Sequence, residues 1–263
     1  MTLLGRSLAD GLAIKNAAFE INIGPAWFRI GRGRRDRSGT GASVQAYTTF
    51  AQWWLIPRMV EFHRAHPEIE VRLAASLEDV NFSRQNLDAV IASKPSSSEK
   101  NVSDFLLPRH LLPVCAPSLL KGQPKKLSPA DVRKFTLLHS LARPEAWGQW
   151  LRSANCPDAR TNRGLKFDSS AMALEGALGG IGIAMDIFEL VQDQLESGQL
   201  VAPFELIHES ERGYYMIRPE DRPISRALQT FLDWLGDQSR RSREKTFRPL
   251  QPKNECWPRP GHS

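Results

Sequence analysis

The sequence predicts an α/β protein built from two similar blocks in series. Short apolar runs of strand length alternate with amphipathic helical runs, beginning at Gly41 and ending near residue 238. Several of the strand-like runs are almost entirely apolar, which is typical of a parallel sheet covered on both faces. The alternation occurs twice, so we expect two Rossmann-like subdomains rather than one sheet with a single set of helices.

The order of the runs also predicts how the two subdomains are connected. Subdomain I comprises residues 42–114 and 212–238, and subdomain II comprises residues 118–205. A chain that leaves one block, builds another and then returns must cross between them twice. We therefore predict a double hinge crossover, near residues 113–118 and 203–213.

The elements of the first subdomain follow from periodicity. Leu55, Met59 and Phe62 form the apolar stripe of a helix, and Pro57 must kink or restart it because its ring clashes with the carbonyl of Trp53. The pair His66-Pro67 ends that helix. The predicted elements are a strand at 42–47, the helix from 48 to 65, strands at 68–76 and 87–93, and one or two extended segments at 106–117 broken by prolines.

The second block repeats the pattern. Ser128 is the expected N-cap of a helix that has Pro129 in its first position, and Trp147, Trp150 and Leu151 share one face of another helix. We expect helices at 128–134, 145–154, 169–180 and 186–198, and strands at 135–140, 164–168, 181–185 and 199–204. The return to the first block adds a strand at 213–219 and an amphipathic helix at 224–238.

Charge and cysteine content bound the location and the partners. The net charge of +6 arises from two basic flanks, since residues 29–39 carry five Arg and one Asp and residues 239–263 carry seven Lys or Arg and two Glu, whereas residues 40–238 sum to −3. Such flanks either attract nucleic acid through its phosphates or are simply solvated, and we expect 239–263 to be a disordered tail. Three scattered cysteines, no secretory signal and no apolar run of bilayer length indicate a cytoplasmic protein without a membrane partner.

Polar residues at predicted strand ends mark a candidate ligand site. Ligands of open α/β sheets bind outside the carboxyl ends of the strands, next to helix N-termini that favour anions. In the first subdomain these positions are held by Thr48, Thr49, Ser76, Ser93 and Lys94, and in the second by Asp168, Ser169 and Ser170. For the threonines and for Asp168 and Ser169, a plain helix-capping role is the alternative.

Other chemistries have little support in the sequence. His63 and His66 lie three apart on one predicted helix, but no third ligand accompanies them, so we expect neither a metal nor another cofactor. The chain has no GxSxG, HExxH or P-loop motif, and we therefore do not expect an enzyme.

Seven segments together resemble the effector-binding domain of LysR-type transcriptional regulators, over residues 42–237. They occur in the family's order and spacing and are most similar to the subgroup of the glycine-cleavage activator. The resemblance implies the fold of type 2 periplasmic solute-binding proteins, with a cleft for a small, often anionic, metabolite and self-association into dimers or tetramers. The segments are FAQWWLIPRMVEFHRAHPEIEVRL, NLDAVIAS, LLPVCAPSLL, LLH, FDSSAMALEGALGGIGIAM, GQLVAPF and YYMIRP with FLDWL.

The sequence departs from the family at its start. The family begins with a winged helix-turn-helix and a long linker helix, whereas LLGRSLADGL near residue 1 resembles only the end of the wing and the start of the linker. Residues 20–40 contain glycines and a proline that would break a linker helix. We therefore expect a truncated regulator, a gene remnant or a reading frame with a misplaced start, in which DNA contact would depend on a module absent here. A solute-binding protein of the same fold is the alternative function.

Overall fold

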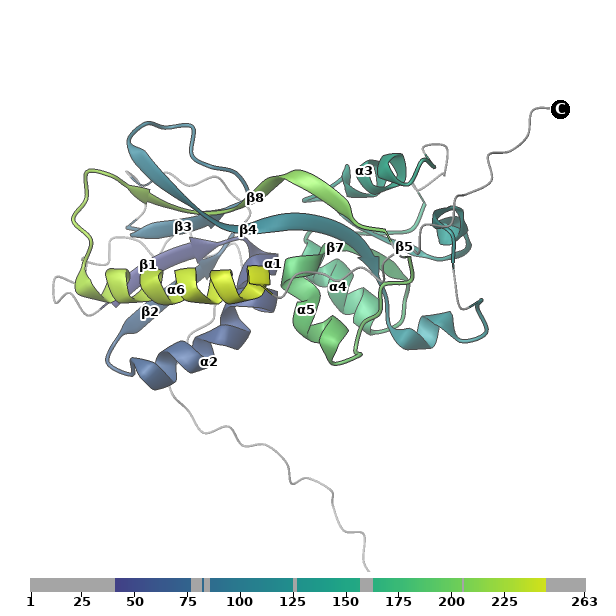
Figure 1. Cartoon of the computed structure of the whole chain (residues 1–263), viewed down its shortest axis with the longest axis horizontal. Coiled ribbons are helices and arrows are strands. Elements are labelled where there is room, and N and C mark those ends of the chain that lie inside the picture. The colour runs from purple at the N-terminus through teal and green to yellow at the C-terminus, as the bar shows by residue number, and fades with distance from the viewer. Residues whose placement is uncertain are drawn as a thin grey trace, which may run out of the picture.

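The computed structural model describes residues 41–76, 82, 86–124, 127–156, 163–204 and 206–244. In these residues a single mixed sheet of eight strands runs in the order β2-β1-β3-β8-β4-β7-β5-β6. Figure 1 shows two lobes joined by a pair of long strands, β4 (Asn101–Val114) and β8 (His208–Pro219), which run from one lobe into the other. The predicted α/β architecture with a double crossover is confirmed.

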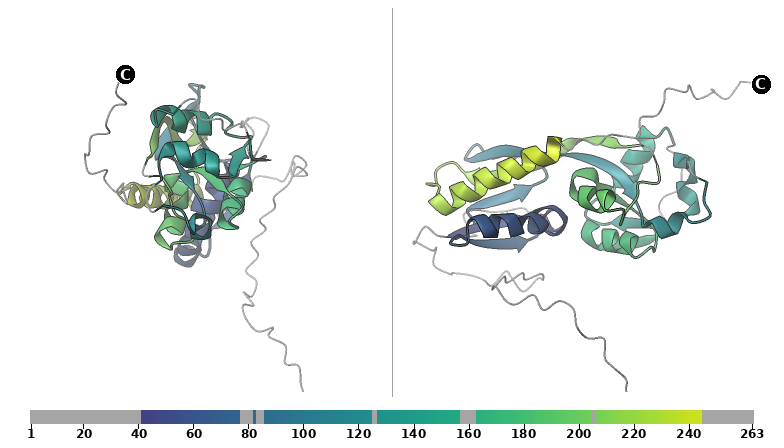
Figure 2. Two further views of the ribbon diagram at one scale, coloured as in Figure 1. Left: turned by 90° about the vertical axis from the view of Figure 1, so that its right-hand side faces the viewer. Right: turned by 60° about the horizontal axis from the view of Figure 1, so that its bottom comes forward.

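The first lobe contains the amino-terminal block and the last helix. Strand β1 pairs in parallel with β2 and β3, and β3 pairs antiparallel with β8. Helix α6 packs against β1, β4 and α2, and the right panel of Figure 2 shows α6 and α2 on the same lobe. The elements are β1 (Gly41–Ala46), α1 (Thr48–Phe50), η2 (Ala51–Leu55), α2 (Ile56–Ala65), β2 (Glu70–Ala75), β3 (Ala89–Ala92) and α6 (Arg226–Glu244).

The second lobe repeats this arrangement. Strand β5 pairs in parallel with β6 and β7, and β7 pairs antiparallel with the end of β4. The predicted face of α3 is buried, with Trp150 fully inaccessible. The elements are η3 (Pro117–Leu120), η4 (Pro129–Lys134), β5 (Leu137–Ser140), α3 (Ala146–Ser153), β6 (Leu165–Phe167), α4 (Ser170–Leu178), β7 (Ile183–Ile187) and α5 (Phe188–Glu196).

Pro57 is accommodated by a wider helical turn. The residues before it, Ala51–Leu55, form a π-helical turn, and the N–H of Ile56 donates to the carbonyl of Ala51. A proline supplies no N–H, and a π turn removes the need for an i to i−4 bond at that point. The guanidinium of Arg58 donates to the carbonyl of Trp54 at 2.9 Å, which adds a side-chain hydrogen bond at this turn.

Several predicted boundaries were wrong. The segment 106–117 is not broken by its prolines, because Pro108 lies at a shift of register where the ladder with β8 is interrupted. Residues 199–204 form only an isolated bridge between Val201 and Cys115. Residues 128–134 form a 3-10 rather than an α-helix, and Asp186 and Ile187 belong to β7 instead of the following helix.

Helix α6 extends six residues into the predicted tail. Those residues are polar, but Ser239 and Ser242 are buried because their hydroxyl groups have partners. The Ser239 hydroxyl donates to the carbonyl of Leu106, and the indole N–H of Trp54 donates to the Ser242 hydroxyl at 3.0 Å. The amide of Gln192 on α5 donates to the carbonyl of Ser242 at 3.3 Å, so the last turn of α6 connects both lobes. Residues 245–263 lie outside the described residues, as do residues 1–40.

Candidate functional site

The carboxyl ends of both sets of parallel strands converge on the middle of β4 and β8. Ala92 at the end of β3 lies opposite Tyr215, which pairs with Phe105 of β4. Ile187 at the end of β7 lies opposite Leu111 of β4. Only residues 106–110 of β4 therefore separate the two sheet edges, and the chain crosses between the lobes within continuous strands.

The predicted residues of the first lobe gather at its edge. Thr48 and Thr49 open helix α1 directly after β1, with Thr49 buried and Thr48 half-buried. Tyr47 is the N-cap and makes no side-chain cap, so the first N–H groups of the helix have no capping side chain. Ser76 follows β2, and its N–H donates to the carbonyl of Ala46 at 3.0 Å. Ser93 and Lys94 follow β3, with Lys94 exposed.

The predicted residues of the second lobe lie at the start of α4. Asp168 is exposed, and the hydroxyl of Ser169 accepts a bond of 3.3 Å from the N–H of Met172, so Ser169 caps this helix. Ser170 is buried, and its hydroxyl accepts a bond of 2.7 Å from Nε of Arg143. Helices α1 and α4 are neighbours, so the helix that carries the threonines meets the helix that follows Asp168 and Ser169.

A cavity of about 200 Å³ lies at the edge of the first lobe. Its lining includes two of the predicted residues, Ser76 and Lys94, together with Tyr47, Asn101 and Gln45. This volume suits a small metabolite, since cavities for drug-sized ligands begin near 300 Å³. The lining does not include Thr48, Thr49, Ser93 or the three predicted residues of the second lobe.

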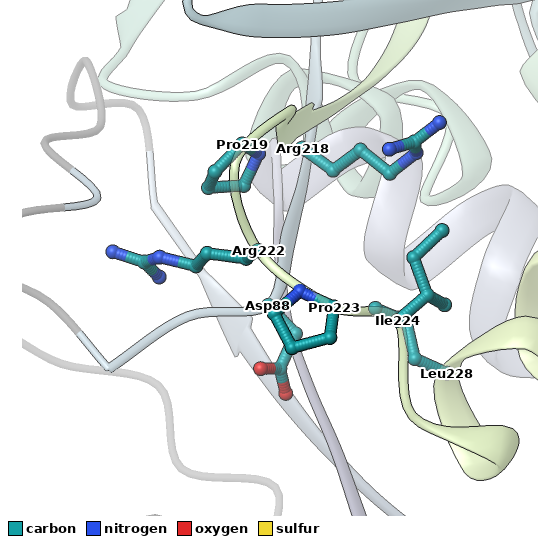
Figure 3. Close-up of a pocket in the computed structure, with 7 residues that line it drawn as sticks. All are labelled: Asp88, Arg218, Pro219, Arg222, Pro223, Ile224 and Leu228. Carbon is teal, nitrogen blue, oxygen red and sulfur yellow. The ribbon is translucent and has the colours of Figure 1, made fainter.

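A second cavity, shown in Figure 3, is a poor ligand site. Its volume is about 60 Å³, which is roughly two water molecules. Two of its charged residues already have structural partners. Arg222 donates to the carbonyls of Phe82 and Leu87, and the carboxylate of Asp88 accepts a bond of 2.8 Å from the N–H of Ser43.

A buried ion pair stands at the edge of the second lobe. Arg143, in the turn after β5, donates to Oδ1 of Asp186 at 2.9 Å, and the Asp186 side chain is fully inaccessible. The N–H of Ile187 donates to the same oxygen at 2.8 Å. Burial raises the pKa of Asp186, and the charge of Arg143 opposes that rise. The same Arg143 binds Ser170, so this cluster holds the first turn of α4 in place.

Arg109 lies between the two edges, on β4. Its side chain is buried, with 8% of its surface exposed, and its guanidinium carbon lies 5.8 Å from the centre of the Tyr214 ring. Burial lowers the pKa of Arg109, and its electrostatic neighbours include Tyr47 from the first lobe and Arg143 from the second. Tyr214 also packs against Phe50 of α1, with ring centres 4.8 Å apart.

Sequence reasoning missed this charged cluster. Arg109 had a usable signal, because it is a charged residue within the largely apolar run LLPRHLLPV, and it is buried on β4. Asp186 had a weaker one, since it directly follows the apolar run IGIAM. Arg143 lies in a turn with no periodicity, and no local pattern relates it to Asp186, 43 residues later.

His110 forms a second ion pair beside the crossover. Its Nδ1 contacts Oε1 of Glu189, and its backbone N–H donates to Oε2 of the same residue at 3.2 Å. The hydrogen bond to Glu189 raises the pKa of His110, burial opposes this rise, and the charges of Glu189 and Glu209 support it. The pair joins β4 to the first turn of α5.

We expect this pair to make stability depend on pH. A histidine whose folded pKa lies above the unfolded value of 6.5 contributes its stabilisation below that value and loses it as pH rises through the folded pKa. Urea unfolding from pH 5.5 to 8.5 should therefore show the free energy of unfolding falling by roughly 1–2 kcal/mol, as for a hydrogen bond to a charged group. His110→Gln should flatten this dependence, and an unchanged slope would contradict it.

The described residues contain no cluster of three or more His, Cys, Asp and Glu side chains suited to a metal ion. Among the same residues, no helix combines the length and the apolar character needed to cross a membrane. The arrangement offers hydroxyl groups, helix N-termini and guanidinium groups, which bind polar or anionic molecules without chemical conversion.

Comparison with known proteins identifies the domain. The sequence profile described as LysR substrate binding domain matches residues 42–240. The chain is 34% identical over 211 residues to the HTH-type transcriptional activator AmpR of Rhodobacter capsulatus, covering 80% of this chain and 70% of that protein. It is 30% identical over 210 residues to the glycine cleavage system transcriptional activator of Escherichia coli K12, covering 80% and 68%.

A solved structure agrees. The effector domain of AmpR from Pseudomonas aeruginosa superposes with a TM-score of 0.66 at 28% identity, over 78% of this chain and 98% of that one. These relatives are transcriptional regulators and not enzymes. The chain therefore belongs to the LysR family of transcriptional regulators, and residues 42–240 are its effector-binding domain.

Proposed function

We propose that this domain senses a small metabolite in the cleft between its lobes and transmits its presence to transcription. The observation that carries the proposal is the convergence of two sheet edges, and of α1 with α4, on residues 106–110 of β4. A molecule held by both edges favours their closed arrangement over any open one. The proposed contacts are Thr48, Thr49, Ser76, Ser93, Lys94, Asp168, Ser169 and Ser170.

The proposed partners follow from the family. Regulation of transcription requires DNA, which we propose is contacted through a helix-turn-helix module and not through the effector-binding domain. We also propose association with further copies of the chain, as a dimer or tetramer, and a cytoplasmic location. The basic residues of the flanks contact phosphates without reading sequence, so they do not replace such a module.

Replacing Thr48 and Thr49 together by valine should abolish ligand-induced stabilisation. The change removes two hydroxyl groups from the start of α1 and keeps the shape of the side chains, so the protein should still fold. A bound ligand at 100 times its Kd stabilises by about 2.7 kcal/mol, which a thermal-shift screen of metabolites detects as a higher Tm. The double variant should show no such shift.

Thr136→Val is the matched control, because Thr136 is exposed and precedes the amino end of β5, whereas the proposed site lies at the carboxyl ends of the strands. This variant should respond to the ligand as the parent chain does. An equal ligand response in the parent and the double-valine variant would remove the threonines from the site. Failure of all metabolites to stabilise the parent chain would count against the proposed function itself.

A further inference from the structure

Arg109 is a buried cation without an acidic partner. Within the described residues no carboxylate lies at ion-pair distance from its guanidinium group, and its Nε has no hydrogen-bond partner. Asp186 is bound by Arg143, and the other buried carboxylate beside β4, Glu189, is bound by His110. Burying a charge is costly unless it is paired, so such a residue is retained at a cost to stability.

The surrounding cluster carries one unit of uncompensated positive charge. Two guanidinium groups, those of Arg109 and Arg143, lie within electrostatic range of each other and of the carboxylate of Asp186. Glu189 also lies within electrostatic range of the neighbouring Tyr214, but it is paired with His110. Asp186 makes its direct contact with Arg143. A molecule with one negative charge would balance the group.

The same cluster has hydrogen-bonding atoms left over. Nη1 of Arg143 and the hydroxyl of Ser140 are buried donors without partners, and Oδ2 of Asp186 is a buried acceptor without one. These residues are adjacent, since the N–H of Arg143 donates to the carbonyl of Ser140 at 3.0 Å. Buried polar atoms are nearly always bonded, so these atoms offer hydrogen bonds to a small polar molecule.

We propose that Arg109 fixes the charge class of the effector, which is a compact metabolite carrying a single carboxylate held between Arg109 and Arg143. The inference rests on the proposed function, because it assigns the anchor of the same cleft. A hydroxyl group next to the carboxylate would donate to Oδ2 of Asp186. The favoured ligands are therefore 2-hydroxy carboxylates, because a 2-amino carboxylate is a zwitterion without net negative charge.

A carboxylate fits better than a phosphate. The planar guanidinium fork matches the two oxygens of a carboxylate, and one negative charge matches the single surplus positive charge. A phosphate monoester brings about −1.5 to −2 charges at neutral pH and three strong acceptor oxygens, which exceeds what this cluster neutralises.

The test compares Arg109→Met with Arg212→Met. Arg212 is exposed on β8 and lies within electrostatic range of Arg109, so the control removes the same charge nearby without touching the buried cluster. Thermal shifts and calorimetric Kd values are measured for acetate, propionate, lactate and glycolate, each paired with its primary amide. The ligand-free Arg109→Met variant should be at least as stable as the parent chain, because an unpaired buried charge has been removed.

We expect lactate or glycolate to stabilise the parent chain and Arg212→Met, and their amides to have no effect. In Arg109→Met the Kd for the acid should rise about tenfold or more. An amide that binds as well as its acid, or an unchanged Kd in Arg109→Met, would overturn the proposal.

The two proposals fail in different ways. If Arg109→Met keeps its ligand response while the Thr48 and Thr49 double-valine variant loses it, the cleft binds effector without Arg109 as its anchor, and only this inference falls. If none of the eight compounds stabilises the parent chain, the single-carboxylate class is wrong, while a response to other metabolites in the wider screen would preserve the proposed function.

Discussion

Replacing Arg143 by methionine should lower the free energy of unfolding by about 3 kcal/mol at neutral pH. The change leaves Asp186 fully buried with only the N–H of Ile187 bonded to it, and it also removes the donor to Ser170. Breaking a buried ion pair from one side is costly because the remaining charge has lost both water and its partner. Urea unfolding of the parent chain and the variant measures the loss.

The pH dependence separates an electrostatic cause from lost packing. Arg143 is the largest influence that lowers the pKa of Asp186, so its removal should raise that pKa further. A carboxyl group with a raised folded pKa destabilises increasingly as pH rises above the unfolded value near 3.8. The deficit of Arg143→Met should therefore shrink towards acidic pH, where Asp186 is protonated.

The double variant Arg143→Met with Asp186→Asn is the matched control, since it removes both charges of the pair. It should recover much of the stability lost by Arg143→Met alone. A deficit that is the same at pH 4.5 and pH 7.5, with no recovery in the double variant, would mean that the pair serves packing alone.

The predictable part of the fold is the part governed by local pattern. The apolar faces of α2 and α3, the buried run of β3 and the end of α2 at His66 all followed from periodicity and from proline. The continuous strand β4 did not, because a proline at a register shift is decided by the partner strand and not by the segment itself. The length of α6 was missed for the same reason, since its buried serines find partners on Leu106 and Trp54.

The candidate site is also only partly predictable from local pattern. The positions of Thr48, Ser93 and Ser170 at strand ends and helix starts could be predicted, because those boundaries are visible in the sequence. Arg109, Arg143 and Asp186 come from three separate segments, and their relation is created by the pairing of β4 with β7 and β8. Whether the eight predicted residues contact an effector stays a prediction.

Replacing Trp54 by alanine should destabilise the protein by about 3–5 kcal/mol. The Trp54 side chain is fully inaccessible to solvent. The centres of the Trp54 and Phe50 rings lie 4.9 Å apart, and the guanidinium carbon of Arg58 lies 4.8 Å from the centre of the Trp54 ring. Arg58 in turn lies 3.3 Å from Asp193 of α5. The substitution therefore leaves a large cavity where the π turn of the first lobe meets a helix of the second.

Two smaller changes divide this effect into packing and hydrogen bonding. Trp54→Phe keeps most of the ring volume and loses the N–H that donates to Ser242, while Ser242→Ala removes only the acceptor. Ser242→Ala leaves a buried indole N–H unpaired and should cost about 1–3 kcal/mol, with Trp54→Phe costing less than Trp54→Ala. Equal losses in Trp54→Phe and Trp54→Ala would assign the whole effect to the hydrogen bond.

The same variants test whether the last turn of α6 connects the lobes. Ser242 accepts from Trp54 of the first lobe and, through its carbonyl, from Gln192 of the second. Ser242→Ala breaks the bond to Trp54 and keeps the carbonyl that binds Gln192. If this turn couples the lobes, amide hydrogen exchange should increase in η2 and also in α5, although the bond from α5 itself is intact. Increased exchange confined to η2 and the end of α6 would show that this turn covers the lobes without coupling them.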